Sequence, residues 1–118
     1  MKLPESTIGL CAGRHDIPVK KYIFTDVQNV LDFKTLNHIA EQFVLDNCNP
    51  RLTQGQGISQ EGYDDVSVWT GDPMDVVVTG LTACTTAVMW ACARYGIPLA
   101  LWHYDRESGN YVPQRFSF

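Results

Sequence analysis

A β-branched strand pattern followed at once by an almost uncharged helix pattern constrains the fold of this chain most strongly. In residues 75–79 the three valines are apolar and every residue except Asp75 is β-branched, which is typical of a central strand that is covered on both faces. Gly80 breaks this pattern. In the next segment, residues 81–95, Arg94 is the only ionised side chain, so we expect a helix that is buried against a sheet.

The residues after this helix predict a hairpin. The helix ends at Gly96 and Pro98, in the usual order of helix-stopping residues. Residues 97–104 resume an apolar strand pattern, 106–109 predict a tight turn, and 110–116 return as a hairpin partner. The last forty or so residues therefore read as β, α, β, β, and a right-handed crossover makes the first two of these strands parallel.

The first half of the chain supplies shorter elements. Residues 8–12 predict a short buried strand that runs into the polar turn 13–16, and residues 22–24 predict a second extended segment. Apolar positions then recur at helical spacing over residues 32–46, with Asp32 placed to cap the first turn. We therefore expect one domain over residues 1–118 of the α/β (α+β) class: a small mixed sheet with two helices.

A long surface loop is expected between the two halves. Residues 47–50, Asn-Cys-Asn-Pro, stop the helix, and the following segment of about twenty residues is rich in Gly, Gln, Asp and Ser. Loops of this length in compact domains are often binding lids. Residues 66–69 alternate like a strand near its end.

Composition excludes several classes of protein. The net charge of −4 and the pI near 5.1 argue against a protein that neutralises duplex phosphates with a broad basic face. The longest apolar stretch, residues 76–93, is interrupted by Gly80 and several threonines, and no apolar run of signal-peptide length follows Met1. These features predict a cytoplasmic location.

The cysteine and tryptophan side chains are expected to pack in the hydrophobic core. The four cysteines form no C-x-x-C pair, which favours reduced, buried thiols over disulfides or a zinc site. Trp69, Trp90 and Trp102 are more typical of a core than of ligand platforms, and Trp90 lies in the middle of the apolar helix. No cofactor and no metal site are predicted.

The segment Thr79-Gly80-Leu81-Thr82 is a candidate anion site. There a strand ends on a glycine and a helix begins, with backbone N–H groups beside two hydroxyls. Orphan N–H donors and the helix dipole both favour a phosphate at such a position. The alternative is that the threonines only cap the helix, because the segment lacks the full glycine fingerprint and the Walker lysine.

The segment 103–109, His-Tyr-Asp-Arg-Glu-Ser-Gly, is expected at the same edge of the sheet. Ligands of open α/β sheets bind at the carboxyl ends of the strands. Arg106 is suited to grip a phosphate, with Tyr104 or His103 lying against a base or ribose. The alternative is an ordinary hairpin turn in which Asp105 and Arg106 pair in solvent.

Catalysis has weaker support in the sequence. Arg14 and His15 follow the first strand and are expected at the same edge or at a subunit contact. His15 and His103 are candidates for a general base, but neither has an identifiable partner at short spacing. We therefore expect a binding protein rather than an enzyme.

Three segments together resemble a known family: CAGRHDIPV (residues 11–19), VVVTGLTACTTAV (76–88) and LALWHYDRESGNYVPQ (99–114). They are similar to the phage-encoded Thoeris anti-defence proteins of the first described type, small sponges that sequester cyclic ADP-ribose signals. The similarity spans nearly the whole chain.

The resemblance implies a non-enzymatic decoy in the host cell cytoplasm that binds the signal made by a TIR-domain enzyme. It also implies a homo-oligomer, dimer or hexamer, with signal pockets between subunits and, in some members, separate sites for cyclic oligonucleotides. The candidate ligand-binding residues come from the strand-end reading above, with Arg51 added from the long loop: Arg14, Arg51, Thr79, Gly80, Thr82, His103, Tyr104 and Arg106.

Two other classes stay open. A metal-independent ring nuclease or phosphodiesterase for cyclic oligonucleotides would share the small strand-helix-strand core and the arginine and histidine at strand ends. An interaction module without a small ligand would instead use Tyr104, Tyr111 and Phe116 as a protein contact.

Overall fold

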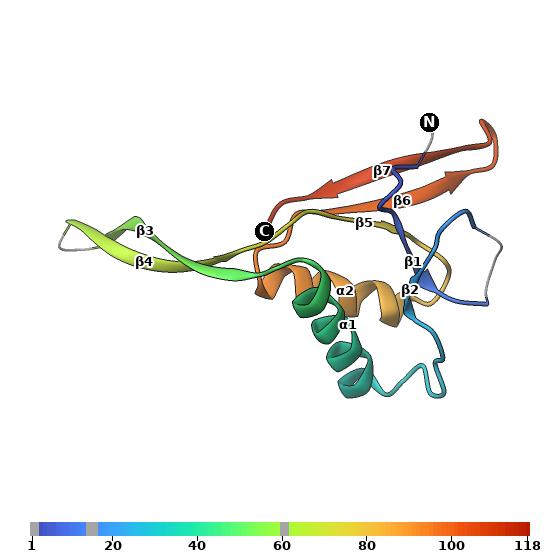
Figure 1. Cartoon of the computed structure of the whole chain (residues 1–118), viewed down its shortest axis with the longest axis horizontal. Coiled ribbons are helices and arrows are strands. Elements are labelled where there is room, and N and C mark those ends of the chain that lie inside the picture. The colour runs from blue at the N-terminus through green and yellow to red at the C-terminus, as the bar shows by residue number, and fades with distance from the viewer. Residues whose placement is uncertain (1–2, 14–16, 60–61) are drawn as a thin grey trace.

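The computed structural model describes residues 3–13, 17–59 and 62–118, and within the two longest strands it leaves out the side chains of residues 54–59 and 62–67. The elements in chain order are β1 (Ile8–Cys11), β2 (Tyr22–Phe24), α1 (Phe33–Asn47), β3 (Arg51–Ser59), β4 (Gly62–Thr70), β5 (Met74–Val77), α2 (Thr82–Arg94), β6 (Leu99–Asp105) and β7 (Asn110–Phe116) (Figure 1).

Five strands form a mixed sheet in the order β2-β1-β5-β6-β7. Its first four strands run parallel to their neighbours, and β7 pairs antiparallel with β6, with Tyr104 opposite Tyr111. The α+β class and the C-terminal β-α-β-β unit, with parallel β5 and β6, are confirmed. The carboxyl ends of β1, β5 and β6 therefore meet at one edge of the sheet.

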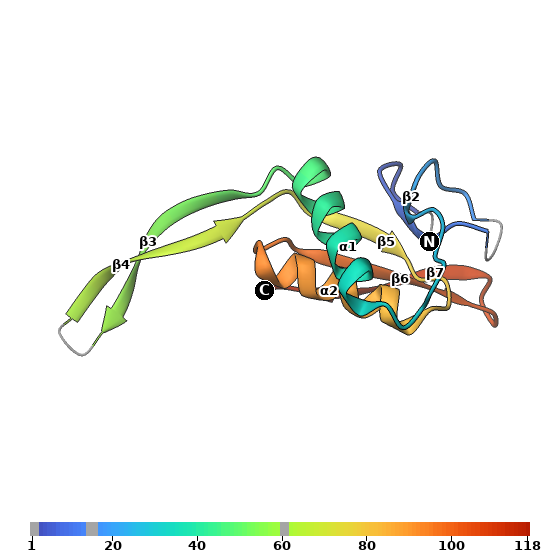
Figure 2. The ribbon, with the colours of Figure 1, turned by 90° about the horizontal axis from the view of Figure 1, so that it is seen from below.

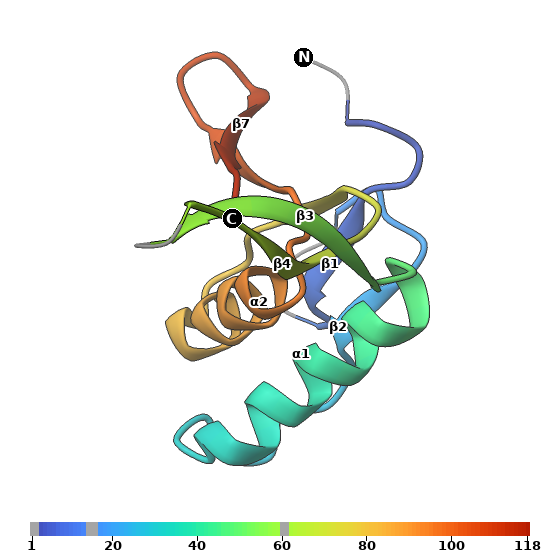
Figure 3. The same ribbon diagram turned by 90° about the vertical axis from the view of Figure 1, so that its left-hand side faces the viewer.

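Both helices lie on the same face of this sheet (Figures 1 and 3). Asp32 caps α1, because its carboxylate accepts hydrogen bonds from the backbone N–H and the hydroxyl of Thr35. The helices bury small or branched side chains against the strands: Leu36, Ala40, Val44, Cys84, Ala87, Val88, Ala91 and Cys92. Small residues let α2 approach the sheet closely, so most of its burial comes from alanine and cysteine.

The opposite face of the sheet has its own small core. Val77, Ala100 and Trp102 are buried there beneath the partly buried side chains of Leu3, Ile17, Val19 and Tyr111. The indole N–H of Trp102 donates to Asp75 at 2.9 Å, which satisfies its polar atom. The central strand β5 is thus covered on both faces, as its β-branched sequence predicts.

The prediction of a long surface loop after α1 is wrong. Residues 51–70 form the hairpin β3–β4, in register from Arg51 opposite Thr70 to Ser59 opposite Gly62, and it projects away from the sheet (Figures 1 and 2). Because the segment contains many glycines and glutamines, it lacks a clear alternation of apolar and polar residues, the pattern by which a strand is recognised in a sequence. A two-stranded ladder nevertheless pairs backbone groups whatever the side chains are.

The prediction for the tryptophans holds only for Trp102. Trp90 is 42% exposed and Trp69 is 41% exposed, whereas Trp102 is buried. Because α2 is apolar on all sides, its sequence does not show which side faces the sheet, and the small residues take that side. The four cysteines are all buried, and no disulfide joins them.

Candidate functional site

A cleft of about 620 Å³ lies at the carboxyl ends of β5 and β6. Its wall combines the end of β5, the turn after it, and the β6–β7 hairpin. The lining residues are Ile17, Val77, Val78, Thr79, Gly80, His103, Tyr104, Arg106 and Tyr111. Five of the eight residues expected to bind a ligand are therefore brought together: Thr79, Gly80, His103, Tyr104 and Arg106.

The turn after β5 gives the cleft its floor. The backbone N–H of Val78 donates to the carbonyl of Trp102 at 3.0 Å, so the chain follows β6 for one residue beyond the end of β5. Gly80 then adopts a φ of +72°, in the left-handed region that favours glycine. This conformation turns the chain from the strand into α2 and exposes a backbone without a side chain to the cleft.

Thr79 ties two strand ends together. It is buried, and its hydroxyl accepts a hydrogen bond from the backbone N–H of Cys11 at 3.2 Å and lies 3.4 Å from the carbonyl oxygen of Cys11. Both hydrogen-bonding directions of this hydroxyl are therefore directed at β1 rather than at the cleft. Thr79 shapes the site by fixing β5 against β1.

The start of α2 contradicts the reading in which the threonines only cap the helix. The capping residue is Leu81, which makes no side-chain hydrogen bond to the helix, so the threonines do not cap it. Thr82 is exposed and lines a second hollow with apolar residues of the α1 entry, among them Leu31 and Phe33. Thr82 is thus not among the residues that line the cleft with Arg106.

The hairpin β6–β7 places an aromatic wall beside the cleft. Tyr104 and Tyr111 are opposite each other in the register, and their rings lie 5.3 Å apart at an interplanar angle of 64°. Tyr104 is 56% exposed. A half-exposed aromatic ring of this kind offers a face on which a planar base can stack.

The turn of the hairpin leaves Arg106 available. Asp105 accepts hydrogen bonds from the hydroxyl of Ser108 and the backbone N–H of Glu107, which lowers the pKa of its carboxyl group below 3.8. The alternative in which Asp105 pairs with Arg106 is therefore wrong. Over the ranges that the structure describes, no carboxylate lies within ion-pair distance of the exposed Arg106.

His103 also lines the cleft, and its hydrogen-bond partner is an amide. Its Nε2 lies 2.9 Å from the side-chain oxygen of Gln114 on β7. Since an amide oxygen only accepts, this contact favours a proton on Nε2. A general base is usually oriented by a carboxylate, and here the partner is neutral.

Of the remaining candidate residues, the structure describes only the position of Arg51. Arg51 begins β3, where it pairs with Thr70 at the root of the hairpin, and it does not line the cleft. Arg14 and His15 fall outside the described residues. Within the described ranges, no three His, Cys, Asp or Glu side chains are grouped so that they could hold a metal ion.

Four lining residues were not among the candidates: Ile17, Val77, Val78 and Tyr111. The position of Tyr111 follows from the predicted turn at 106–109, because a hairpin closed there brings residue 104 opposite residue 111. Ile17 has no such signal, since it enters through the loop between β1 and β2.

Comparison with protein-family models, with curated proteins and with solved structures finds no match to this chain. Among the described residues, no helix has the length and apolar character needed to cross a membrane.

Proposed function

We propose that the protein is a phage anti-defence sponge that holds a cyclic ADP-ribose-type immune signal in the β5–β6 cleft, in the host cell cytoplasm, without cleaving it. The observation that carries this proposal is the position of Arg106, an exposed guanidinium without a carboxylate partner in the described ranges, at the mouth of a cleft with an aromatic wall. The three segments that resemble the Thoeris anti-defence family include both sides of this cleft.

The dimensions and chemistry of the cleft suit a nucleotide. Small-molecule sites usually enclose about 300–1,000 Å³, and the value of about 620 Å³ lies in this range. Arg106 presents a planar fork of donors that matches a pyrophosphate, and Tyr104 presents a ring face to a base. Gly80 allows the ligand to approach the backbone closely, because it has no side chain.

The polar groups of the cleft favour holding over cutting. Thr79 is engaged with Cys11, Asp105 is engaged in its turn, and His103 contacts an amide. A nucleophile or general base needs a partner that activates or orients it. These residues instead surround Arg106, whose guanidinium has no carboxylate partner in the described part of the chain and stabilises a bound anion.

The test is recovery of the ligand. The purified protein is mixed with a stoichiometric amount of cyclic ADP-ribose, separated from free ligand, denatured by heat and analysed by chromatography with mass spectrometry. We expect intact cyclic ADP-ribose in the supernatant. Recovery of linear ADP-ribose or another hydrolysed product would contradict the sponge, and failure to retain any ligand would contradict binding.

A second candidate is a metal-independent ring nuclease, and the observation that favours it is the presence of His103 and Arg106 in the same cleft. Incubation with cyclic tri- and tetra-adenylates separates the two functions. An enzyme converts many equivalents of the cyclic oligonucleotide, whereas a sponge binds at most a stoichiometric amount and returns it unchanged.

A further inference from the structure

His103 has one nitrogen atom that the protein leaves open beside the β5–β6 cleft. The residue belongs to β6, is exposed, and lines the cleft with Arg106. Its Nε2 lies 2.9 Å from the side-chain oxygen of Gln114, whereas its Nδ1 makes no hydrogen bond with any residue that the structure describes. One nitrogen of the imidazole is therefore engaged, and the other is available to a ligand.

Gln114 reaches His103 diagonally across the β6–β7 hairpin. In the register, His103 is opposite Val112, and Gln114 is opposite Leu101, two residues earlier on β6. Residues two apart on a strand share a face, so the side chains of Gln114 and His103 lie on the same face of the hairpin, within reach of a long side chain. Gln114 does not line the cleft, so it can act on a ligand only through His103.

The contact with Gln114 sets the tautomer of the imidazole. The amide oxygen only accepts a hydrogen bond, so Nε2 carries the proton, and the neutral ring then has its lone pair on Nδ1. The guanidinium of Arg106, in contrast, only donates. The hairpin thus brings two complementary groups to the cleft: a cation that donates and, three residues before it, a neutral atom that accepts.

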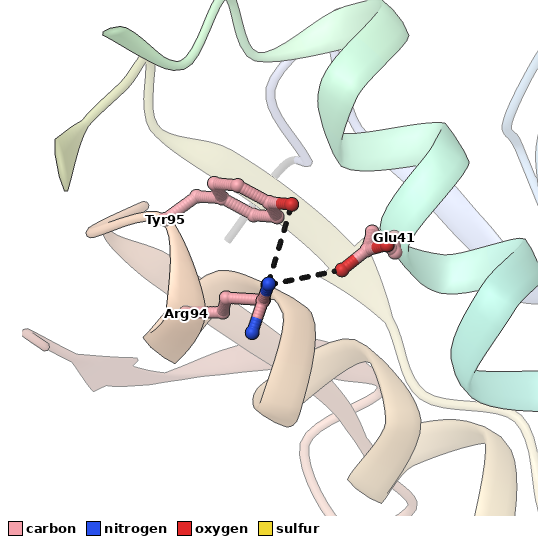
Figure 4. Close-up of polar contacts among 3 residues, drawn as sticks. All are labelled: Glu41, Arg94 and Tyr95. Atoms are coloured by element: carbon pink, nitrogen blue, oxygen red, sulfur yellow. Dashed lines mark hydrogen bonds and ion pairs between the residues drawn. The ribbon is translucent and has the colours of Figure 1, made fainter. Parts of the chain in front are cut away.

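Arg94 at the end of α2 shows the opposite arrangement, in which both partners of a cation come from the protein. Figure 4 shows its guanidinium between the hydroxyl of Tyr95 and the carboxylate of Glu41, which lie 3.3 and 3.1 Å from Nε. In the part of the chain that the structure describes, neither the guanidinium of Arg106 nor Nδ1 of His103 has such a partner. Their hydrogen-bonding capacity is left to a ligand.

We propose that Gln114 positions His103 as a hydrogen-bond acceptor, and that through this acceptor the cleft selects a phosphorylated ligand with a hydroxyl or amino donor near its phosphate. This role rests on the proposed function. Arg106 holds the pyrophosphate of a cyclic ADP-ribose-type signal, and Nδ1 of His103 accepts a hydrogen bond from a ribose hydroxyl or from the exocyclic nitrogen of the base. Both sources offer the same chemistry, a neutral donor.

The acceptor discriminates because a ligand without the donor leaves Nδ1 unpaired. A site that hydrogen-bonds a hydroxyl or an amine rejects the analogue that lacks this group. His103 is exposed, so water takes up part of the loss, and the expected effect is that of one neutral hydrogen bond. An analogue without the donor should therefore bind about three- to tenfold more weakly.

The first test reads the tautomer in the full chain without ligand, from the ¹⁵N chemical shifts of the imidazoles at pH 8. We expect the proton of His103 on Nε2. Gln114→Met keeps the length of the side chain but removes the amide oxygen, so the ring should shift towards the mixture of tautomers of a histidine without such a partner. Gln114→Glu keeps an acceptor oxygen and should restore the proton on Nε2. His38 on α1 is the internal reference and should be the same in all three proteins.

The second test measures affinity by titration calorimetry for cyclic ADP-ribose and for analogues that each lack one donor. In one analogue oxygen replaces the exocyclic nitrogen of the base, and in the others hydrogen replaces one ribose hydroxyl at a time. The analogue that loses about three- to tenfold in affinity identifies the donor that His103 reads. His103→Phe keeps a ring but has no acceptor, so it should bind this analogue as tightly as cyclic ADP-ribose. His38→Phe is the matched control and should discriminate like the wild type.

Positioning by Gln114 predicts a loss of discrimination while the imidazole itself is unchanged. The ratio of the dissociation constants for the analogue and for cyclic ADP-ribose should fall in Gln114→Met and be restored in Gln114→Glu. A mere loss of packing would not be reversed by the acceptor oxygen. Melting curves establish that each variant is folded.

Each failure has its own signature. A wild type that binds no cyclic ADP-ribose would overturn both the proposed function and the selection of its ligand. Binding that all analogues share equally, discrimination that persists in His103→Phe, or a proton on Nδ1 in the wild type would overturn the role of His103 while the sponge stands. Discrimination that Gln114→Met leaves unchanged would overturn the positioning by Gln114.

Discussion

Asp105 accepts a hydrogen bond from the hydroxyl of Ser108 at 2.8 Å, within the turn that joins β6 to β7. The carboxylate of Asp105 is therefore hydrogen-bonded within the turn. The guanidinium of the next residue, Arg106, forms no ion pair with any carboxylate in the described ranges. The turn therefore positions a cation at the cleft without neutralising it. A charge kept in this state is suited to an anionic ligand.

The first prediction concerns the titration of Asp105. The hydrogen bond from Ser108 is the main cause of the lowered pKa, so Ser108→Ala should raise the pKa of Asp105 towards 3.8. Because the folded pKa lies below the unfolded value, the stabilisation by this carboxylate is present above roughly pH 3.9 and is lost as the pH falls through the folded pKa. Carboxyl carbon chemical shifts measured against pH report the pKa, and Ser117→Ala should leave it unchanged.

The second prediction concerns Arg106. Arg106→Ala should weaken binding of cyclic ADP-ribose by roughly 10- to 150-fold, since a hydrogen bond to a charged group contributes about 1.5–3 kcal/mol. The melting temperature should not change, because the side chain is exposed. Titration calorimetry measures the affinity. Arg115→Ala, an exposed arginine on β7 outside the cleft, is the control and should bind like the wild type.

The core of the fold was predictable because its signals are local and strong. Residues 22–24 and 110–116 form strands with the predicted bounds, and α1 and α2 begin and end within one residue of the expected helices. Periodicity and stop residues suffice for these elements. The parallel pairing of β5 and β6 then follows from the handedness of the crossover.

The β3–β4 hairpin and the hydrogen bonds of the candidate site were less predictable, because they depend on contacts between distant residues. The hairpin has only a weak alternation of apolar and polar residues, and its composition is that of a loop. Its two strands are paired by backbone hydrogen bonds, which the composition does not reveal. Thr79 and Thr82 have the same local signal, yet a hydrogen bond to Cys11, 68 residues away, turns the hydroxyl of Thr79 inward. Nothing within a few residues of Thr79 encodes that contact.

The third prediction tests the link between β1 and β5. Thr79→Val keeps the shape of the side chain but removes the hydroxyl that bonds the buried backbone of Cys11. We expect a loss of about 1–3 kcal/mol in the free energy of unfolding, measured by urea denaturation. Thr86→Val, at an exposed position of α2, should change it by less than about 0.5 kcal/mol. Equal effects of the two substitutions would show that the bond to Cys11 stabilises nothing.

The fourth prediction concerns the thiols between the helices and the sheet. Burial raises the pKa of Cys92 to about 12 and that of Cys48 to about 11. Native protein at pH 8 should therefore react very slowly with a disulfide reagent, because the thiolate is the nucleophile, and unfolded protein should react at once. Rapid labelling of Cys92 in the native state would contradict its placement in the core.

The same shift makes stability depend on alkaline pH. Because the folded pKa is higher than the unfolded value of about 8.5, the contribution of Cys92 is complete below that pH and is lost as the pH rises towards about 12. In Cys92→Ala the free energy of unfolding should fall less between pH 9 and 11 than in the wild type. Comparing the two slopes cancels the titration of lysines and tyrosines common to both proteins.

The fifth prediction concerns the contact between Gly96 and the base of the β3–β4 hairpin. Gly96 has a φ of +60°, and a Cβ there would collide with the carbonyl oxygen of Trp69. Gly109 has a φ of +72° but open space around the same position, where the nearest atom, the hydroxyl oxygen of Tyr104, is 4.0 Å away. Alanine at either site adopts a left-handed conformation at a cost of about 1–2 kcal/mol, and only Gly96→Ala adds a collision with backbone.

Urea denaturation should therefore show a larger loss of stability for Gly96→Ala than for Gly109→Ala. The added loss should be localised, because the collision pushes β4 away from the end of α2. Hydrogen exchange of the amides around Trp69 and Asp72 should accelerate in Gly96→Ala and stay unchanged in Gly109→Ala. If both variants showed the same loss in free energy of unfolding and the same amide exchange, the close approach of Trp69 to Gly96 would not be what holds the β3–β4 hairpin against the end of α2.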